Sequence, residues 1–313
     1  MQTEFEFIRN IKSKYGLQAI GDDCAVVPKD AKTDLVITTD MLVEDVDFRL
    51  DWATPESLGH KALAVSLSDI AAMGGRPKWA LLSIGIPESI WGSSFTDKFY
   101  AGWFGLARSH EVEMIGGDIS RTPDKIVIDS IVGGEVGRGK AVMRSGAKPG
   151  DSIFLTGSLG GAAAGLSLLE TENRIAGRKK RELVASQLRP IPRIEIGKYL
   201  SRYGLATAMI DVSDGLGADL HHLCEASSAG ATIELDKIPV DANLSVIERD
   251  IFDFALGGGE DFELLFTSKN KIISSGKSVP ISRIGEITPN SGIVELVQNN
   301  SSLKLPRTGF RHF

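Results

Sequence analysis

The chain has 313 residues, 42% hydrophobic and 24% charged, and 35 Lys and Arg against 41 Asp and Glu give a formal net charge of −6. This acidic balance argues against a protein that coats nucleic acid or anionic membranes. No stretch approaches the roughly 18 apolar residues of a membrane span, and the acidic N-terminus does not resemble a signal peptide. Cys24 and Cys224 lie too far apart in sequence to indicate a disulfide framework or a zinc site. We therefore expect a soluble, cytoplasmic protein of two domains.

The first half alternates short apolar runs with helical patterns, which is typical of an α/β protein. Residues 35–37 predict a buried strand. Thr54 followed by Pro55 predicts the start of a helix, which Gly74 and Gly75 should end. A second helix is expected over about 95–109, and the runs 126–128 and 131–134 predict further strand.

The second half begins after a polar, turn-rich stretch at 144–151, where we place the domain boundary. The predicted domains are residues 1–148 and 149–313. Strands are expected at 153–155 and 208–210, with a helix over 161–170 between them. The fold class is therefore α/β, with one domain in each half.

Aspartates beside glycine or hydroxyl residues recur where these strands and helices end. They occupy six sites, at Asp22-Asp23, Asp40, Asp69, Asp118, Asp211 with Asp214, and Glu260-Asp261. A single aspartate of this kind is usually a turn residue. Six of them with few basic neighbours would repel one another strongly if the fold brought them together, unless cations were bound.

Asp69 is the most unusual of these acids, because helical spacing places it on the same apolar face as Ala62, Val65 and Met73. A carboxylate on a buried face costs several kcal/mol unless it is paired or bound to a metal. Asp69 therefore either caps a neighbouring helix, pairs with an arginine, or binds a metal.

Taken together, the acids favour a Mg²⁺–nucleotide site, since carboxylate and hydroxyl oxygens bind Mg²⁺ and Mg²⁺ recruits phosphates. Ordinary nucleotide motifs do not account for them. The segment 134–141 nearly matches a Walker A loop, but Ala141 stands where Ser or Thr would bind Mg²⁺, so we interpret it as a turn between strands. The segment 157–161 opens a helix and favours helix packing over anion binding.

The same residues form a series of motifs that resembles the thiamine-monophosphate kinase family. The motifs appear in family order, as Gly-Asp-Asp-Cys at 21–24, Thr-Thr-Asp at 38–40, Leu-Ser-Asp-Ile-Ala-Ala-Met-Gly at 67–74, Gly-Gly-Asp at 116–118, the segment 144–151, Asp-Val-Ser-Asp-Gly at 211–215 and the segment 257–265. Each motif is short, but their combination is specific. The resemblance implies ATP-dependent phosphorylation of thiamine monophosphate to thiamine diphosphate. It also implies the two-domain aminoimidazole ribonucleotide synthetase-like fold and a homodimer formed through the N-terminal sheet.

The resemblance also implies roles for individual residues. Several Mg²⁺ ions would be held by Asp23, Thr38, Thr39, Asp40, Asp69, Asp118, Asp211 and Asp214. ATP would contact Tyr100, Gly117, Asp118, Arg144 and Ser213. Thiamine monophosphate would contact Glu260 and Phe310, and the family often has Trp at the position of Phe310. No residue is required as nucleophile or general base.

Position 47 departs from the family pattern. The family usually reads Glu-Gly-Val-His-Phe, with the His assigned to the substrate, whereas this chain reads Glu-Asp-Val-Asp-Phe at 44–48. Asp47 would therefore reach the substrate through a cation or contact the ring amine instead. Two alternatives remain at this point: a sister ATP-using synthetase of the same superfamily, and a nucleotide-binding protein that has lost turnover. The complete acid series favours the kinase over both.

Overall fold

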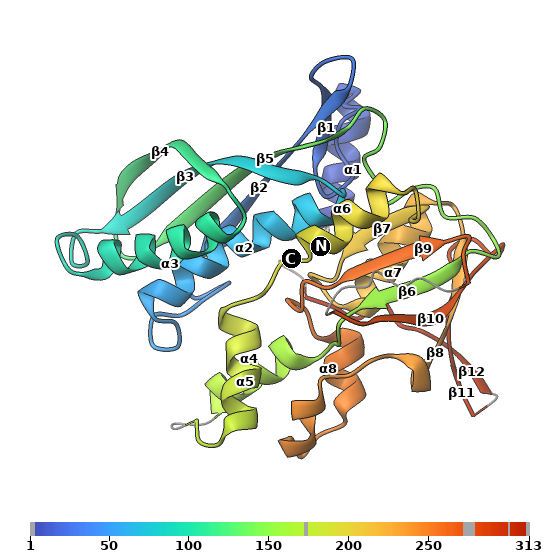
Figure 1. Cartoon of the computed structure of the whole chain (residues 1–313). Coiled ribbons are helices and arrows are strands. Elements are labelled where there is room, and N and C mark those ends of the chain that lie inside the picture. The colour runs from blue at the N-terminus through green and yellow to red at the C-terminus, as the bar shows by residue number, and fades with distance from the viewer. Residues whose placement is uncertain (1–3, 172–174, 272–278, 300, 311–313) are drawn as a thin grey trace.

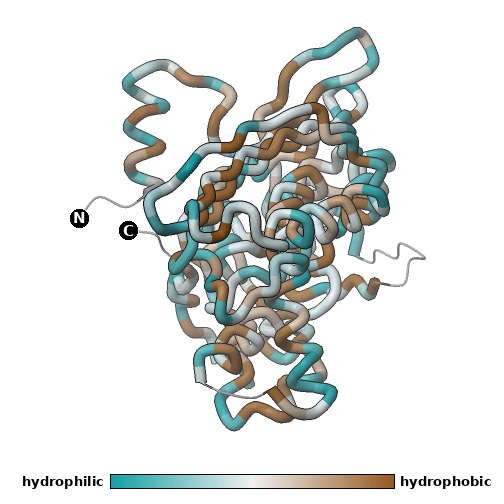
Figure 2. The backbone as a smooth tube through the Cα atoms, turned by 90° about the vertical axis from the view of Figure 1, so that its left-hand side faces the viewer, coloured by the Kyte–Doolittle hydropathy of each residue, from teal (hydrophilic) through white to brown (hydrophobic). Residues whose placement is uncertain are grey.

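The computed structural model describes residues 4–171, 175–271, 279–299 and 301–310. Within them the chain forms two mixed β-sheets, each covered by helices, which confirms the predicted α/β class. In the described residues no helix is long and apolar enough to span a membrane. The N-terminal helix α1 (Glu4–Tyr15) stands beside the main body, within which the hydrophobic segments are concentrated (Figure 2).

The first sheet has the order β1-β2-β5-β3-β4, with only β3 and β4 parallel. Its strands are β1 (Ala25–Pro28), β2 (Thr33–Val43), β3 (Arg76–Pro87), β4 (Glu113–Thr122) and β5 (Val127–Gly137). Helices α2 (Pro55–Ala72) and α3 (Phe95–Ser109) cover one face (Figure 1). Along β2, Val36, Thr38 and Leu42 are buried while Thr39 and Met41 are exposed, because alternate side chains point to opposite faces. The other face of this sheet is therefore open.

The second sheet has the order β12-β11-β8-β10-β6-β9-β7. Its strands are β6 (Ser152–Thr156), β7 (Ala208–Asp211), β8 (Gly230–Glu234), β9 (Leu264–Ser268), β10 (Ile281–Thr288), β11 (Val294–Gln298) and β12 (Ser301–Lys304). The accompanying helices are α4 (Gly161–Thr171), α5 (Arg178–Leu188), α6 (Ile194–Arg202), α7 (Leu216–Ala226) and α8 (Ile251–Gly257). The boundary predicted after residue 148 lies in the loop between β5 and β6.

Helix α2 joins the two halves. Thr54 caps its N-terminus by accepting a hydrogen bond from the Ser57 backbone N–H, and Pro55 occupies the first turn, as predicted. Almost every residue of α2 is buried, because it packs on the first sheet, on α3, and on α6 and β7 of the second half. The largest hydrophobic cluster accordingly contains residues of both halves, such as Leu67 and Phe266. The site described below depends on this central position of α2.

One local prediction was wrong. The Walker-like segment is not simply a turn, since its first residues, Gly134 to Gly137, lie within β5. Gly133 and Gly134 are required there by close packing, because a Cβ on Gly133 would lie 2.1 Å from the Trp79 ring. The predicted strand runs 126–128 and 131–134 thus belong to one continuous strand, except that Ile126 precedes it. The segment 157–161 does follow a strand and open a helix, as expected.

Candidate active site

A buried cluster of carboxylates lies where α2 meets β7. One oxygen each of Asp23, Asp69 and Asp211 lies within 4.8 Å of the other two. Asp23 precedes β1, Asp69 is in the last turn of α2, and Asp211 ends β7, so three distant segments supply them. Asp69 accepts a hydrogen bond from the Thr38 hydroxyl, and Asp211 accepts one of 2.5 Å from Ser68. Among the described residues Asp69 therefore neither caps a helix nor forms an ion pair with an arginine, which leaves metal binding as the remaining alternative.

The cluster has too few cations for its acids. Arg144 donates to Asp23 at 2.5 Å and is the basic group that pairs directly with it. Burial, above all, together with the charges of neighbouring carboxylates raises the pKa of Asp40 to about 6 and that of Asp211 to about 7. The pKa of Asp69 is raised well above its usual value, mainly by burial and to a smaller extent by the charges of Asp40 and Asp211. The cluster therefore has a strong requirement for positive charge.

The donor atoms fit a hard divalent cation. Oδ2 of Asp23 and Oδ2 of Asp40 are both buried, and neither has a hydrogen-bond partner in the described part of the chain. Buried polar atoms are nearly always paired, so these two oxygens are available to a ligand. The cluster offers carboxylate oxygens together with the hydroxyls of Thr38 and Ser68, the type of ligand atom that Mg²⁺ prefers.

Two of the expected metal ligands lie elsewhere. Thr39 follows Thr38 on β2, so its side chain points to the open face of the sheet, where it donates to Asp129 at 2.7 Å. Strand register places Asp118 on that same face, since Asp118 is paired with Ser83 and Ser83 with Asp129. Gly117 and Asp118 are both exposed on the edge strand β4. A second group of oxygens, separate from the buried cluster, is thus formed on the open face.

Tyr100 is also separate from the cluster within this chain. It lies on α3, where its ring contacts Phe99 and Phe104. Its side chain is half-buried and packs against the hydrophobic core. In the single chain it therefore forms part of the α3 packing surface.

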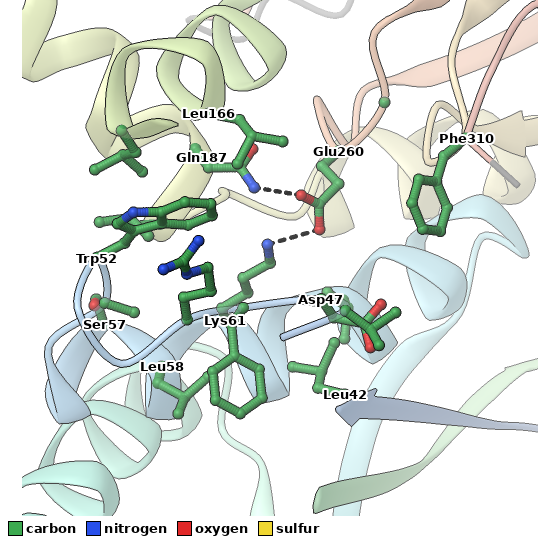
Figure 3. A pocket seen from close by; sticks show the side chains of 18 of the residues that line it. Leu42, Asp47, Trp52, Ser57, Leu58, Lys61, Leu166, Gln187, Glu260 and Phe310 are labelled. Atoms are coloured by element: carbon green, nitrogen blue, oxygen red, sulfur yellow. Dashed lines mark hydrogen bonds and ion pairs between the residues drawn. The ribbon is translucent and has the colours of Figure 1, made fainter. Parts of the chain in front are cut away.

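A cavity of about 530 Å³ lies beside the acidic cluster, between α2, α5 and the loop after α8. Asp40, Ser213 and Asp214 line the end near the cluster. The Asp214 loop is held by Asp219, a buried residue of α7 whose carboxylate accepts the backbone N–H groups of Asp214 and Gly215. Trp52, Leu58 and Leu166 line the other end (Figure 3). The cavity is therefore polar and acidic at one end and largely apolar at the other.

Glu260 lies between these two ends. Lys61 of α2 and Gln187 of α5 approach its carboxylate from opposite helices (Figure 3). The Lys61 Nζ to Glu260 Oε1 distance is 2.7 Å, and the Gln187 amide donates to Oε2. Glu260 and Phe262 both have positive φ, +66° and +50°, which is unusual for residues other than glycine. Such backbone conformations persist where the surrounding structure imposes them, often at binding sites.

Asp47 and Phe310 also line the cavity. Asp47 Oδ2 accepts a hydrogen bond of 2.8 Å from the Val43 backbone N–H and so closes the turn that follows β2. This contact gives Asp47 a structural role that the sequence alone did not indicate. Phe310 lies across the cavity from Trp52 (Figure 3).

Comparison with known proteins agrees with this architecture. Residues 21–136 match the family model of the AIR synthase related protein N-terminal domain, and residues 148–298 match that of its C-terminal domain. The thiamine-monophosphate kinase of Bacillus subtilis is 38% identical over 303 residues, covering 94% of this chain and 93% of the relative. That of Escherichia coli K12 is 38% identical over 305 residues, covering 94% and 91%. The chain belongs to the thiamine-monophosphate kinase family.

Solved structures agree with the thiamine-monophosphate kinase assignment. The structure described as AaThiL complexed with AMPPCP and TMP has a TM-score of 0.91 and 35% identity, covering 99% of this chain and 97% of that chain. Thiamine monophosphate kinase from Aquifex aeolicus has a TM-score of 0.84 and 34% identity, covering 95% and 97%. The predicted two-domain fold and family membership are therefore confirmed.

Several residues of this thiamine-monophosphate kinase site were missed by the sequence analysis. Lys61, Gln187, Trp52 and Arg49 all line the cavity. Lys61 had a usable signal, because it lies two helical turns before Asp69 on the same face of an otherwise apolar helix. Gln187 had none, since it is a single glutamine in a segment of mixed polar and apolar residues.

Proposed function

We propose that this protein transfers the γ-phosphoryl group of ATP to the phosphate of thiamine monophosphate, forming thiamine diphosphate and ADP. The observation that carries the proposal is the cavity that runs from Asp40, a charged neighbour of the acidic cluster, to Glu260. Along α2, Lys61 and Asp69 are eight residues apart, which corresponds to about 12 Å at 1.5 Å per residue. An extended thiamine monophosphate molecule fits this span with its phosphate at the cluster and its pyrimidine ring near Glu260.

We assign the substrate roles as follows. Arg144 and Ser213, with Gly117, Asp118 and Tyr100, would contact ATP. Glu260 and Phe310 would contact the thiamine moiety. Asp47, already bonded to the Val43 backbone, would shape the entrance and would not bind the substrate phosphate directly. Two domains meeting near residue 148 would supply these groups.

We assign Mg²⁺ to Asp23, Thr38, Asp40, Asp69, Asp211 and Asp214, and to Thr39 and Asp118 on the open face. Bound Mg²⁺ would neutralise the phosphate charges and stabilise negative charge in the transition state. The chain itself holds these oxygens in place, positions the two anionic reactants in line, and keeps Arg144 beside the cluster. A general base is unnecessary, because the acceptor phosphate oxygen is ionised at neutral pH.

Removal of metal should reveal the strain of the acidic cluster. Asp40 and Asp211 have pKa values of about 6 and about 7, above the ordinary 3.8, so the folded protein binds more protons than the unfolded chain. The metal-free protein should therefore lose stability as pH rises from about 4 to about 7. Mg²⁺ competes with those protons, and its stabilising effect should grow over the same range. Thermal unfolding with EDTA or Mg²⁺ at about pH 5.5 and about pH 8 measures this, and a Mg²⁺ shift independent of pH would contradict it.

We further propose a homodimer formed through the first sheet. Its edge strand β4 exposes Ile115 and Ile119, and the open face exposes Met41. Exposed apolar edge strands readily pair with another chain. Dimerisation here would also cover Gly117 and Asp118, bringing a second surface to the proposed nucleotide contacts.

Ile119→Glu should weaken this dimer about tenfold or more, because a charge would be buried in an apolar contact. Sedimentation equilibrium of the full chain measures the change. Leu303→Glu on β12, at the edge of the other sheet, is the matched control and should leave the association unchanged. Equal effects of the two substitutions, or a monomeric unchanged protein, would contradict the interface.

The activity is tested by incubating the purified protein with ATP, Mg²⁺ and thiamine monophosphate and separating the products by chromatography. Equal amounts of thiamine diphosphate and ADP are expected. ADP without thiamine diphosphate would indicate another acceptor, and no turnover would favour a nucleotide-binding protein; either result overturns the proposal.

A further inference from the structure

The carboxylate of Glu260 is fixed from two sides. We propose that Lys61 and Gln187 are positioning residues that hold it as a hydrogen-bond acceptor for the amino group of the substrate's pyrimidine ring. They would thereby make the enzyme select a 4-aminopyrimidine over a 4-oxopyrimidine. This inference rests on the proposed function and assigns a selective step to groups that the phosphoryl transfer itself does not use.

Lys61 supplies the first constraint. Its side chain is 3% exposed, whereas that of Glu260 is 30% exposed. A buried ammonium is costly without an anionic partner, so the 2.7 Å contact between Lys61 Nζ and Glu260 Oε1 is strongly favoured. Because Lys61 lies in the middle of α2, which is packed on all sides, the position of this charge is set by the core. Glu260 Oε1 is thereby held toward α2.

Gln187 supplies the second constraint. It is 4% exposed on α5, and its amide nitrogen donates to Glu260 Oε2. The amide orientation is determined by this contact, since only the NH₂ group can donate to a carboxylate. Its Oε1 atom is buried without a hydrogen-bond partner among the described residues, so the amide has no competing contact there that favours rotation.

The backbone around Glu260 is held as well. Its N–H donates to the Ser213 carbonyl at 2.8 Å. The next residue, Asp261, accepts N–H groups of Gly160 and Ala162 at 2.6 and 3.0 Å. The positive φ of Glu260 is thus imposed by contacts on both sides. Neither the backbone nor the side chain can turn away without losing several hydrogen bonds.

The consequence is a preoriented acceptor. A carboxylate accepts about four hydrogen bonds, and Lys61 and Gln187 occupy one on each oxygen. Glu260 lines the cavity and its side chain is partly exposed, so its remaining lone pairs can accept from a ligand there. An amino group can donate to them. A ring carbonyl in its place would instead put its own acceptor oxygen against the carboxylate, and no hydrogen bond would form. Sites built around such a hydrogen bond reject the mismatched analogue strongly.

The test compares thiamine monophosphate with its 4-oxo analogue, oxythiamine monophosphate. In the unchanged protein the ratio of kcat/KM should favour the amino substrate by about a hundredfold or more. Gln187→Glu keeps the side-chain shape but replaces the donor by an acceptor. It should raise KM for thiamine monophosphate about tenfold, leave kcat within about threefold, and reduce the preference for the amino substrate.

Lys61→Met tests the other contact, with Lys198→Met as the matched control. Lys198 forms an ion pair with Glu195 on α6 and does not line the cavity. Lys61→Met should reduce the amino preference, and Lys198→Met should not. If Lys61→Met does not fold, the double variant Lys61→Met with Glu260→Gln removes both charges and should fold with the preference lost.

Three outcomes separate the possibilities. Loss of amino preference with a raised KM supports the inference. A lower melting temperature in the Gln187 and Lys61 variants with unchanged preference shows that these residues are merely structural and overturns it. Failure of the unchanged protein to phosphorylate thiamine monophosphate overturns the proposed function instead, and is recognised before any variant is made.

Discussion

Asp211→Asn is expected to lower kcat/KM for thiamine monophosphate by about a thousandfold or more, because it removes a charge that helps to stabilise the transition state. The same substitution should stabilise the metal-free protein. Asp211 is buried at the end of β7 and shares the cluster with Asp23 and Asp69. Burial raises its pKa to about 7, so its ionised form is unfavourable in the fold without a cation. A neutral amide of the same shape removes this cost and still accepts the Ser68 hydrogen bond.

The two effects have opposite signs, which distinguishes a metal ligand from a structural acid. Activity is measured with saturating Mg²⁺·ATP, and stability by thermal unfolding in EDTA at about pH 8, above the pKa of Asp211. The melting temperature should rise by a few degrees. Asp236→Asn, at an exposed acid of the second half, is the control and should change neither quantity. Near-normal turnover of Asp211→Asn would contradict the metal assignment.

Arg144→Met is expected to destabilise the metal-free protein by about 3–5 kcal/mol, because it leaves Asp23 as a buried charge without its partner. Arg144 Nη2 lies 2.5 Å from Asp23 Oδ1, and the Asp23 carboxylate is fully buried. Asp22 accepts the Arg144 backbone N–H, so the segment stays anchored in the variant. Chemical denaturation in EDTA measures the loss.

Mg²⁺ should recover part of this stability, since a divalent cation at the cluster compensates the same carboxylate. Activity should remain low even with Mg²⁺, because the nucleotide would lack the guanidinium contact that we propose for Arg144. The double variant Arg144→Met with Asp23→Asn removes both charges and should be more stable than Arg144→Met alone. If the single and double variants are equally stable, the loss of stability in Arg144→Met does not come from an unpaired Asp23 charge, and the prediction is contradicted.

Much of the architecture could be predicted from local sequence. Thr54-Pro55 and Gly74-Gly75 delimit α2, and the predicted helix 95–109 agrees with α3, because capping residues and helical periodicity act within a few residues. The α/β class and the family could likewise be recognised from short motifs in order. Aspartates at the ends of apolar strands likewise indicated an acidic site.

The tertiary structure determines which acidic side chains lie close together. Thr38 and Thr39 are adjacent, yet strand alternation sends one to the buried cluster and the other to the open face. Asp47 accepts a hydrogen bond from the Val43 backbone N–H because the chain turns after β2. The residue type of Asp47 alone did not predict this contact. Lys61 and Gln187 meet Glu260 only because α2 and α5, 126 residues apart at these positions, pack around one cavity. Short-range sequence patterns specify the helices, the strands and the positions of the acidic residues along the chain. The pairing of side chains across the halves was decided by long-range packing, for which no local pattern exists.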